Sequence, residues 1–333
     1  AILADRADTD TRTWLYVCKD NLLGCKCTAS LNLEPIQGLT IGAVAGLDFV
    51  LSESLEFTPS TAYEEQRSGA PKNELGKISK SKNTNANVTT NVRVTWNRTF
   101  GKHDVTLGAN TDYYWDNMDN MSVTGYGVGQ LKSMAAINQS IEGNRKVSTS
   151  NFREKTAQLG IGLLGGYCYD GTYDIFGTYK ADASSILPKD KRWNAAWAIG
   201  AGWNLKGYGF MKDWEPISTL RFKASYGRTA SLAGVSPSLT VGTFSYLEDS
   251  YGDIRLLELM SLYNHALKPE QTVSTEAGVS LGLYNRVTID LGWYDRRTED
   301  ALLDVPIPAS NGFTTLKRNI GVLSNSGVEM SIN

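Results

Sequence analysis

Histidine and long apolar segments are scarce in this chain, and each shortage excludes a class of protein. The 333 residues include 2 histidines and 9 prolines. His103 and His265 lie in no serine-elbow or glycine-rich phosphate-loop frame, so a Ser-His-Asp hydrolase has no visible active site. No segment reaches the roughly 18 apolar residues of a transmembrane helix. The sequence therefore favours neither such an enzyme nor a helical membrane protein, and we expect no enzyme activity.

The chain also lacks a strong net charge and a recognisable metal site. Its net charge of −2 gives no general electrostatic case for a nucleic-acid partner. Of the four cysteines, Cys18, Cys25 and Cys27 lie close in sequence, but no second Cys-x-x-Cys pair and no histidine lies near them. We therefore expect no metal there. Two interpretations stay open, a disulfide from Cys18 to Cys25 or Cys27 across a surface loop, and free thiols.

Carboxylates gather at two places in the sequence. Asp116 and Asp119 form one group, and Glu248, Asp249 and Asp253 form the other. Such groups are found as glycosidase pairs and as calcium ligands. Groups of carboxylates are just as common in solvated loops, so we expect no cofactor. Calcium bound in an external loop has no further support in the sequence.

Glycine and aromatic residues, in contrast, are plentiful. The chain has 32 glycines, 16 tyrosines and 8 tryptophans, with a mean hydropathy of −0.28. This composition is usual for β-barrel membrane proteins, because half of their strand residues face water. Residues 287–294 show the expected alternation: Val287, Ile289, Leu291 and Trp293 are apolar, and the residues between them are mostly polar or small. With residues 272–283 they form a predicted hairpin long enough to cross a bilayer.

A pass along the chain predicts about twelve antiparallel strands. Their apolar and polar residues alternate, as in residues 193–205, where three tryptophans lie on one face and small or polar residues on the other. The apolar row would meet lipid and the other row the lumen, with aromatic residues at strand ends forming interfacial girdles. The predicted strands are 11–20, 28–36, 39–57, 84–99, 104–120, 151–169, 172–185, 192–206, 217–229, 272–283, 287–303 and 319–332.

The links between these strands alternate in length, with an exception of moderate length at 207–216. An up-and-down barrel places alternate links on opposite sides of the membrane, and outer-membrane barrels have short periplasmic turns and long external loops. The alternation of short and long links therefore predicts an all-β, antiparallel, up-and-down transmembrane β-barrel. The expected tight turns are 37–38, 100–103, 170–171 and 284–286, and the other links are mostly longer, namely 21–27, 58–83, 121–150, 186–191, 230–271 and 304–318.

Several segments also match sequence motifs of a known protein family. The entry "LKPEQT" at 267–272 leads to the hairpin, the exit "YDRRTEDALLDVPIPASNGF" follows at 294–313, and the strand "NIGVLSNSGVE" begins at Asn319. Two upstream segments match strand motifs of the same family, "RWNAAWAIGAGWNL" at 192–205 and "LRFKASYGRTA" at 220–230. This stretch resembles the SusC/RagA family of TonB-linked outer-membrane transporters, densely over residues 193–333 and more loosely before them.

The resemblance implies a larger protein than this chain. The family has a 22-stranded barrel plugged by an N-terminal domain, and residues 1–333 would be part of that barrel domain, about half of it. The plug domain, the TonB box and the later C-terminal strands have no counterpart in these residues, so we expect a fragment that does not function alone. The implied partners are a SusD-like surface lipoprotein, the TonB–ExbB–ExbD complex and outer-membrane lipid. The implied function is import of oligosaccharides or peptides across the cell outer membrane.

Aromatic residues in the long predicted loops are the candidate substrate-binding residues, because sugar rings and peptides bind exposed aromatic faces. Two alternatives stay open: a soluble or surface-attached β-sandwich that acts as an adhesin or glycan-binding module, and an unplugged passive porin. The candidate residues are Tyr63, Tyr126, Phe244, Tyr246, Tyr251 and Tyr263.

Overall fold

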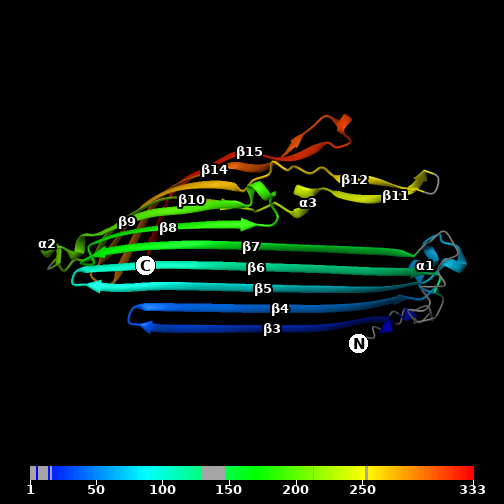
Figure 1. Cartoon of the computed structure of the whole chain (residues 1–333), viewed down its shortest axis with the longest axis horizontal. Helices are drawn as coiled ribbons and strands as arrows, with labels where there is room; N and C mark the ends of the chain where they lie inside the picture. Colours follow the sequence, from blue (N-terminus) through cyan, green and yellow to red (C-terminus); the bar gives the residue numbers. More distant parts are fainter. Residues whose placement is uncertain (1–4, 7–13, 16, 129–146, 213, 252–253) are drawn as a thin grey trace. The chain divides into compact units, whose positions relative to one another are not determined.

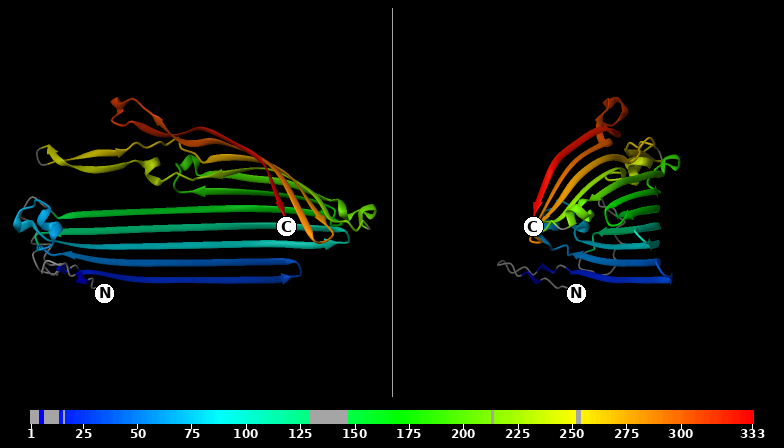
Figure 2. Two further views of the ribbon diagram at one scale, coloured as in Figure 1. Left: turned by 180° about the vertical axis from the view of Figure 1, so that it is seen from behind. Right: turned by 90° about the vertical axis from the view of Figure 1, so that its left-hand side faces the viewer.

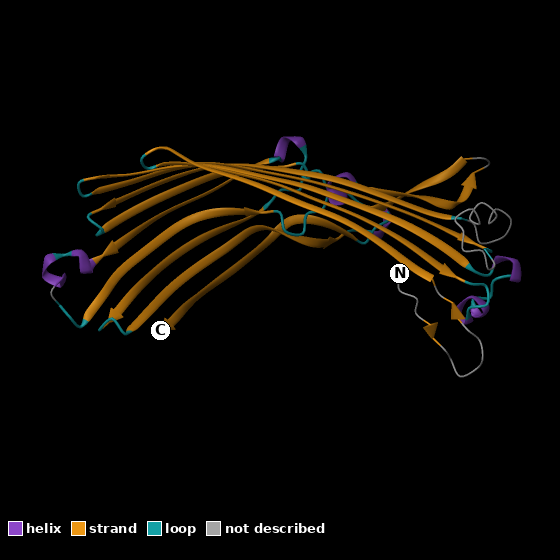
Figure 3. Ribbon diagram, turned by 90° about the horizontal axis from the view of Figure 1, so that it is seen from below, coloured by secondary structure: helices purple, strands orange, loops and turns teal. Residues whose placement is uncertain are grey.

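The computed structural model describes residues 5–6, 14–15, 17–128, 147–212, 214–251 and 254–333. Strands dominate these residues, and the helices are short and lie in the links (Figure 3). None of the described helices is long and apolar enough to span a membrane. The main strands are β3 (Val17–Ile36), β4 (Leu39–Thr58), β5 (Lys77–Phe100), β6 (His103–Tyr126), β7 (Ser148–Tyr169), β8 (Tyr173–Ser184), β9 (Trp193–Asn204), β10 (Ile217–Ser231), β13 (Glu270–Leu283), β14 (Val287–Pro306) and β15 (Thr315–Ile332).

These strands form one eleven-stranded antiparallel sheet of the described chain, in which neighbours follow sequence order from β3 to β15 (Figure 1). This confirms the predicted all-β, up-and-down fold class. A β-sandwich, the alternative interpretation, would divide the strands between two packed sheets. Strands of up to 24 residues, as in β5 and β6, exceed the roughly ten residues that cross a bilayer. Two short strand pairs lie outside the sheet: β1 (Asp5–Arg6) with β2 (Trp14–Leu15), and β11 (Thr243–Tyr251) with β12 (Ile254–Ser261).

The first predicted link was wrong. Residues 21–27 are part of β3, which runs unbroken from Val17 to Ile36, so two predicted strands are one and the sheet has eleven strands instead of about twelve. Asn21, Gly24 and Lys26 are residue types that disfavour strands. Pairing with the 20-residue strand β4 outweighs that preference.

Of the two interpretations left open for the cysteines, the structure has the free thiols, at Cys18, Cys25 and Cys27. All three lie within β3, where Cys18 and Cys25 are seven positions apart, a distance of about 23 Å at the usual rise of a strand. A disulfide needs Cα atoms within about 7 Å. The Sγ atoms of Cys25 and Cys27 lie 3.5 Å apart, because residues two apart share a face of the strand.

Contacts divide the chain into two compact units, residues 1–29, 45–89 and 114–156, and residues 30–44, 90–113 and 157–333. The first unit has a small core of Phe57, Ile78 and Val128, against which Leu55, Val123 and Val147 pack. Its link after β4 carries helix α1 (Tyr63–Arg67) and a 3-10 turn, η1 (Lys72–Glu74). The buried Glu65 holds this link, since its Oε2 accepts a hydrogen bond of 3.1 Å from the amide of Gly76. β5 begins at Lys77, seven residues before its predicted start, so the link is shorter than predicted.

The second unit contains the tight turns, and they lie where the sequence predicts them. Gly38 has φ +85°, Gly101 has φ +62°, and Asp170 and Gly171 have φ +49° and +64°. Tyr284 and Asn285, with φ +53° and +54°, form the turn between β13 and β14. Residues with positive φ at both central positions are typical of two-residue hairpin turns, whose twist matches that of the strands.

Three of the tight turns are bonded to a neighbouring turn or link along this end of the second unit. The backbone amide of Asp170 donates to the carbonyl of Lys102 at 2.7 Å. The backbone amide of Asn204 donates to the carbonyl of Thr172, also at 2.7 Å. Lys102 Nζ also lies 2.7 Å from the Asp170 carboxylate, and this hydrogen bond raises the pKa of Lys102. The link of moderate length at 205–216 contains η4 (Leu205–Gly207) and α2 (Gly209–Lys212). It is bonded to the next turn, because the Pro216 carbonyl accepts a hydrogen bond of 3.0 Å from the Tyr284 amide.

The link from β10 to β13 contains regular structure that the sequence did not predict. Helix α3 (Pro237–Val241) is followed by the hairpin of β11 and β12. In the same unit β13, β14 and β15 run side by side (Figure 2). The register of β13 and β14 pairs Leu283 with Val287 and Gln271 with Glu299, as expected for a hairpin closed at 284–286.

Candidate functional site

Strands β8 to β15 of the second unit present one polar and one apolar face. The register places Asp174, Gly202, Lys223, Gly278, Gly292 and Glu329 in one row across six neighbouring strands. Side chains in one row point to the same side of a sheet, and alternate residues along each strand share that side. We call this side the polar face, and it is the candidate site.

The adjacent row has the opposite character. It consists of apolar or aromatic side chains, and most of them are exposed: Met330 has 65% of its surface exposed, Leu291 46% and Tyr173 44%. Trp203 stacks with Tyr173 at a centroid distance of 6.4 Å. Large exposed apolar surfaces on a sheet are unfavourable in water and favourable in lipid. The row consists of Tyr173, Trp203, Phe222, Val279, Leu291 and Met330.

Glycine determines how side chains lie on the polar face. Asp174 covers Gly202, and the Phe176 ring covers Gly200, so that a Cβ at either glycine would collide with its neighbour. The same holds for Gly278, where a Cβ would lie 2.8 Å from Lys223 Cε. Charged side chains therefore extend across the neighbouring strand instead of standing upright.

Opposite charges meet across the strands of this face. Arg221 Nη2 lies 2.8 Å from Asp174 Oδ1 although β9 lies between their strands, because Gly202 of β9 leaves room for the contact. Further along the face, Arg296 pairs with Glu276, and Lys180 Nζ lies 3.1 Å from Asp182 Oδ1 and 3.4 Å from Asp112 Oδ2. Such exposed pairs contribute little stability. They make the face hydrated and nearly neutral in local charge.

A cavity of about 400 Å³ lies on this face. It is bounded by groups of both charges and by glycine, so it is suited to polar solutes. Its lining includes Asp174, Arg221, Lys223, Glu276, Gly292, Tyr294, Arg296 and Glu329.

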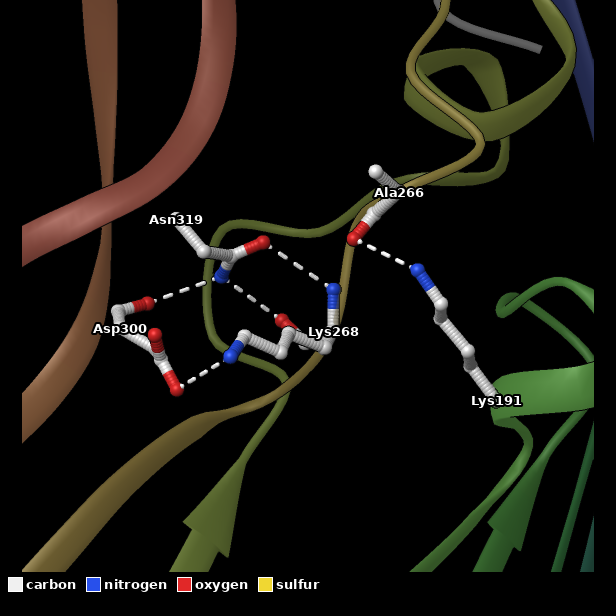
Figure 4. Close-up of polar contacts among 5 residues, drawn as sticks. All are labelled: Lys191, Ala266, Lys268, Asp300 and Asn319. Carbon is white, nitrogen blue, oxygen red and sulfur yellow. Dashed lines mark hydrogen bonds and ion pairs between the residues drawn. The ribbon is translucent and has the colours of Figure 1, made fainter.

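At the other end of the second unit, Asn319 of β15 fixes the base of the long link 232–269 (Figure 4). Its Nδ2 donates to the carbonyls of Lys268 and Asp300 at 2.8 Å each, and its Oδ1 accepts from the Lys268 amide at 3.1 Å. Lys268 Nζ lies 2.7 Å from Asp300 Oδ2. Asp300 has φ +60° beside a register shift of β14, so Asn319 secures an irregular strand. Lys191 Nζ adds a bond of 3.1 Å to the Ala266 carbonyl.

The candidate aromatic residues lie in or next to the long links. In the first unit, exposed Tyr63 begins α1, where its hydroxyl accepts from Arg67, and half-buried Tyr126 ends β6. In the second unit, Phe244 of β11 and Tyr263 are exposed, and the Tyr263 ring lies 4.7 Å from that of His265. The backbones of Tyr246 and Tyr251 belong to β11, but their side chains lie outside the described part. Their roles in binding stay predictions.

The described residues show no group of three or more His, Cys, Asp or Glu side chains arranged to hold a metal ion. Asp119 pairs with Arg153 at 3.6 Å. The side chains of Glu248, Asp249 and Asp253 lie outside the described part, so the calcium hypothesis at that group is untested.

Sequence reasoning assigned no pairing to the charged residues of the polar face and gave Asn319 no role. Period-two alternation indicated which residues share the face, but which of them pair across strands depends on register. Asn319 stood inside a recognised motif, and only the bulge at Asp300 shows what it bonds.

Comparison with known proteins identifies the fold. The TonB-dependent receptor-like β-barrel family matches residues 28–333. The chain belongs to this family. It is 29% identical over 245 residues to TonB-dependent receptor P3 of Formosa agariphila, which covers 72% of this chain and 24% of that protein. It is 30% identical over 198 residues to TonB-dependent receptor SusC of Bacteroides thetaiotaomicron, covering 55% of this chain and 20% of that protein.

Among solved structures, the RagAB peptide importer in its closed-closed state matches with a TM-score of 0.82 and 22% identity, over 99% of this chain and 37% of that one. The ferric-catecholate import receptor Fiu of Escherichia coli matches with a TM-score of 0.54 and 12% identity, over 94% of this chain and 45% of that one. The chain thus spans about a quarter of the curated relatives' length. The SusC/RagA resemblance and the outer-membrane location are confirmed.

Proposed function

We propose that residues 28–333 form part of the wall of an outer-membrane importer of nutrients. The observation that carries this proposal is the two-faced sheet of a TonB-dependent receptor. Its apolar face suits lipid, and its polar face, with charges paired across glycines, suits a hydrated passage. Import requires no covalent step by the wall, so this role needs no nucleophile, base or metal.

The proposed partners follow from the relatives. SusC and the RagA component of RagAB are similar to this chain over much of its length. The complete protein would work with a SusD-like surface lipoprotein that covers its external side. The TonB–ExbB–ExbD complex would supply energy through residues outside this chain.

The proposed substrate is an oligosaccharide or a peptide, captured on the outer side by the long links. Phe244 and Tyr263 offer exposed rings there, and rings bind sugars and peptides through stacking and apolar contact. Because a substrate must be captured and then released inward, several modest contacts suit transport better than one tight site. Tyr63, Tyr126, Tyr246 and Tyr251 complete the proposed set.

Deleting residues 239–251 from the complete receptor tests this role. The deletion removes Phe244, Tyr246 and Tyr251, so uptake of the nutrient by cells should fall. Assembly should persist, because these residues lie outside the eleven-stranded sheet. Assembly is measured by heat-modified gel mobility, and uptake is compared with that of a TonB-deficient strain. Unchanged uptake after the deletion, or full uptake without TonB, would contradict the proposal.

A further inference from the structure

One side of strands β4 and β5 in the first unit carries an apolar band. A Cβ at Gly46 of β4 would lie 2.7 Å from Thr89 Oγ1 of β5, so these two residues share the other, polar side. Successive side chains of a strand alternate, so their chain neighbours lie on the opposite side. We call that opposite side the lipid side, because apolar surface on a sheet is favourable in hydrocarbon. Its apolar residues in this unit are Leu47, Phe49, Leu51, Ala86 and Val88.

Nearer the long links, the lipid side changes from apolar to basic. Lys80 and Lys82 lie on it, because each is an even number of residues before Val88 on the unbroken strand β5. Ser79, beside Lys80, lies on the polar side, where its Oγ is 2.9 Å from Thr124 Oγ1 of β6. The apolar band thus gives way to two lysines at the end of β5 that joins the link 59–76.

Strand β7 contributes two more cations beside β6 (Figure 1). Because Thr124 lies on the polar side, Asp119, an odd number of residues before it on β6, lies on the lipid side. Arg153 Nε of β7 lies 3.6 Å from Asp119 Oδ2, so Arg153 shares the lipid side. Lys155, two residues further along β7, lies there as well.

These four cations form a patch with a surplus of positive charge. All four side chains are exposed, and only Arg153 has an ion pair with another described residue. Two carboxylates, Glu53 and Asp119, lie on the same side, so four cations against two anions leave a surplus of two positive charges. The cations belong to β5 and β7, which are inner strands bordered by β4 and β8, so the surplus is not a property of the sheet edge. The basic patch consists of Lys80, Lys82, Arg153 and Lys155.

The position of the basic patch determines which ligand suits it. The apolar band lies on one side of it along the strands and the long link 59–76 on the other. A bilayer presents its phosphate groups at the same transition from hydrocarbon to water. Lysine and arginine side chains extend to such headgroups while their carbon stems stay on apolar surface. An acidic peptide would meet the same charges but would gain nothing from the apolar band.

We propose that the basic patch binds the phosphate groups of lipid headgroups in the outer leaflet, with the acyl chains lying along the apolar band. The long links lie at this end of the strands, so the leaflet is the one that faces the medium. The inference goes beyond import, because it concerns the lipid around the receptor and not the nutrient. Each lysine or arginine near an anionic membrane surface strengthens attraction about fivefold.

Native mass spectrometry of the complete receptor in detergent tests this site. The probes are dioleoyl phosphatidate and dioleoylglycerol, which differ only in the phosphate. Phosphatidate should bind at least about tenfold more tightly, since its phosphate accepts charge-assisted hydrogen bonds. Lys82→Gln and Lys155→Gln should each weaken phosphatidate binding about fivefold and leave dioleoylglycerol binding unchanged. Lys77→Gln, on the polar side of the same strand β5, is the matched control and should change nothing.

Lys82→Arg keeps the charge and should retain wild-type affinity. Should a Gln variant fail to assemble, the wild-type receptor in about 0.05 M and about 0.5 M ammonium acetate serves instead, because salt screens exposed charges and should reduce the preference for phosphatidate. A preference that does not change with salt would count against the patch.

Equal binding of the two lipids, or wild-type phosphatidate binding by both Gln variants, would overturn the inference. Displacement of phosphatidate by an equal concentration of inorganic phosphate would also overturn it, since the site would then recognise the free ion. Wild-type lipid binding together with weaker capture of the SusD-like lipoprotein by the Gln variants would assign the patch to that protein instead. None of these outcomes bears on the proposed import function, which uptake by cells tests separately.

Discussion

The two faces of strands β8 to β15 are built from alternate residues of the same strands, yet they differ in almost every physical respect. The apolar face has side chains such as Trp203 and Leu291 that stand exposed. The polar face has charged side chains that lie flat over glycines, as Asp174 lies over Gly202. Such a sheet is stable only if one face meets hydrocarbon and the other meets water. The difference therefore indicates the solvent on each side more directly than any single residue does.

A charged substitution on the apolar face should have the largest effect on the free energy of unfolding. Leu291→Arg places a charge on the apolar face and should destabilise the folded sheet by about 2 to 4 kcal/mol near the midplane of the membrane. Gly292→Arg places the same side chain one residue away on the polar face, where a Cβ meets open space, and should cost much less. Equilibrium unfolding of the complete receptor in lipid vesicles measures both. Equal costs would show that the faces are assigned wrongly.

Removing one amide at the bulge between β14 and β15 should have a smaller effect. Asn319→Ala deletes three hydrogen bonds at the base of the link 232–269, each worth about 1 kcal/mol, so a loss of about 2 to 3 kcal/mol is expected. Asn325→Ala, elsewhere on β15, removes no hydrogen bond within the described residues and is the control. Unfolding gives the stability, and limited proteolysis should cut the link faster in Asn319→Ala only. Similar proteolysis of the two variants would mean that Asn319 does not secure the link.

Glycines on the two faces should respond differently to a methyl group. Gly200→Ala would press its Cβ against the Phe176 ring on the polar face and should cost about 1 kcal/mol. Gly165→Ala lies on the opposite face, where nothing approaches within 4 Å, and should be neutral or slightly stabilising. The difference between the two unfolding free energies is the test. A larger penalty at Gly165 would contradict the packing of side chains over polar-face glycines.

Most of the sheet was predictable, because period-two alternation and link length are local properties of the sequence. The hairpin closed at 284–286 and the strand at 193–204 lie where the pattern places them. The loop predicted at 21–27 failed, because residues with weak strand preference were carried into β3 by pairing with β4. The family motif around Asn319 predicted a strand correctly but did not show which groups the Asn319 side chain contacts.

The candidate site was less predictable than the fold. The ion pair of Arg221 with Asp174 joins residues 47 positions apart and crosses an intervening strand at Gly202. A sequence pattern contains the identity of these residues but not the register that aligns them. The aromatic loop residues were selected by residue type alone, and Tyr63 illustrates the weakness of that criterion, since its hydroxyl and ring both contact Arg67.

The central claim is that the sheet spans the outer membrane with its long links outside and its tight turns inside. Cysteine labelling of intact cells tests it most directly, in a receptor whose four native cysteines are replaced by serine. Val241→Cys, in the link after β10, should react with a membrane-impermeant maleimide, because this side chain is 68% exposed and would face the medium. Asn285→Cys, in the tight turn after β13, should react only after the membrane is permeabilised. Labelling of Asn285→Cys in intact cells, with Val241→Cys protected, would contradict the account.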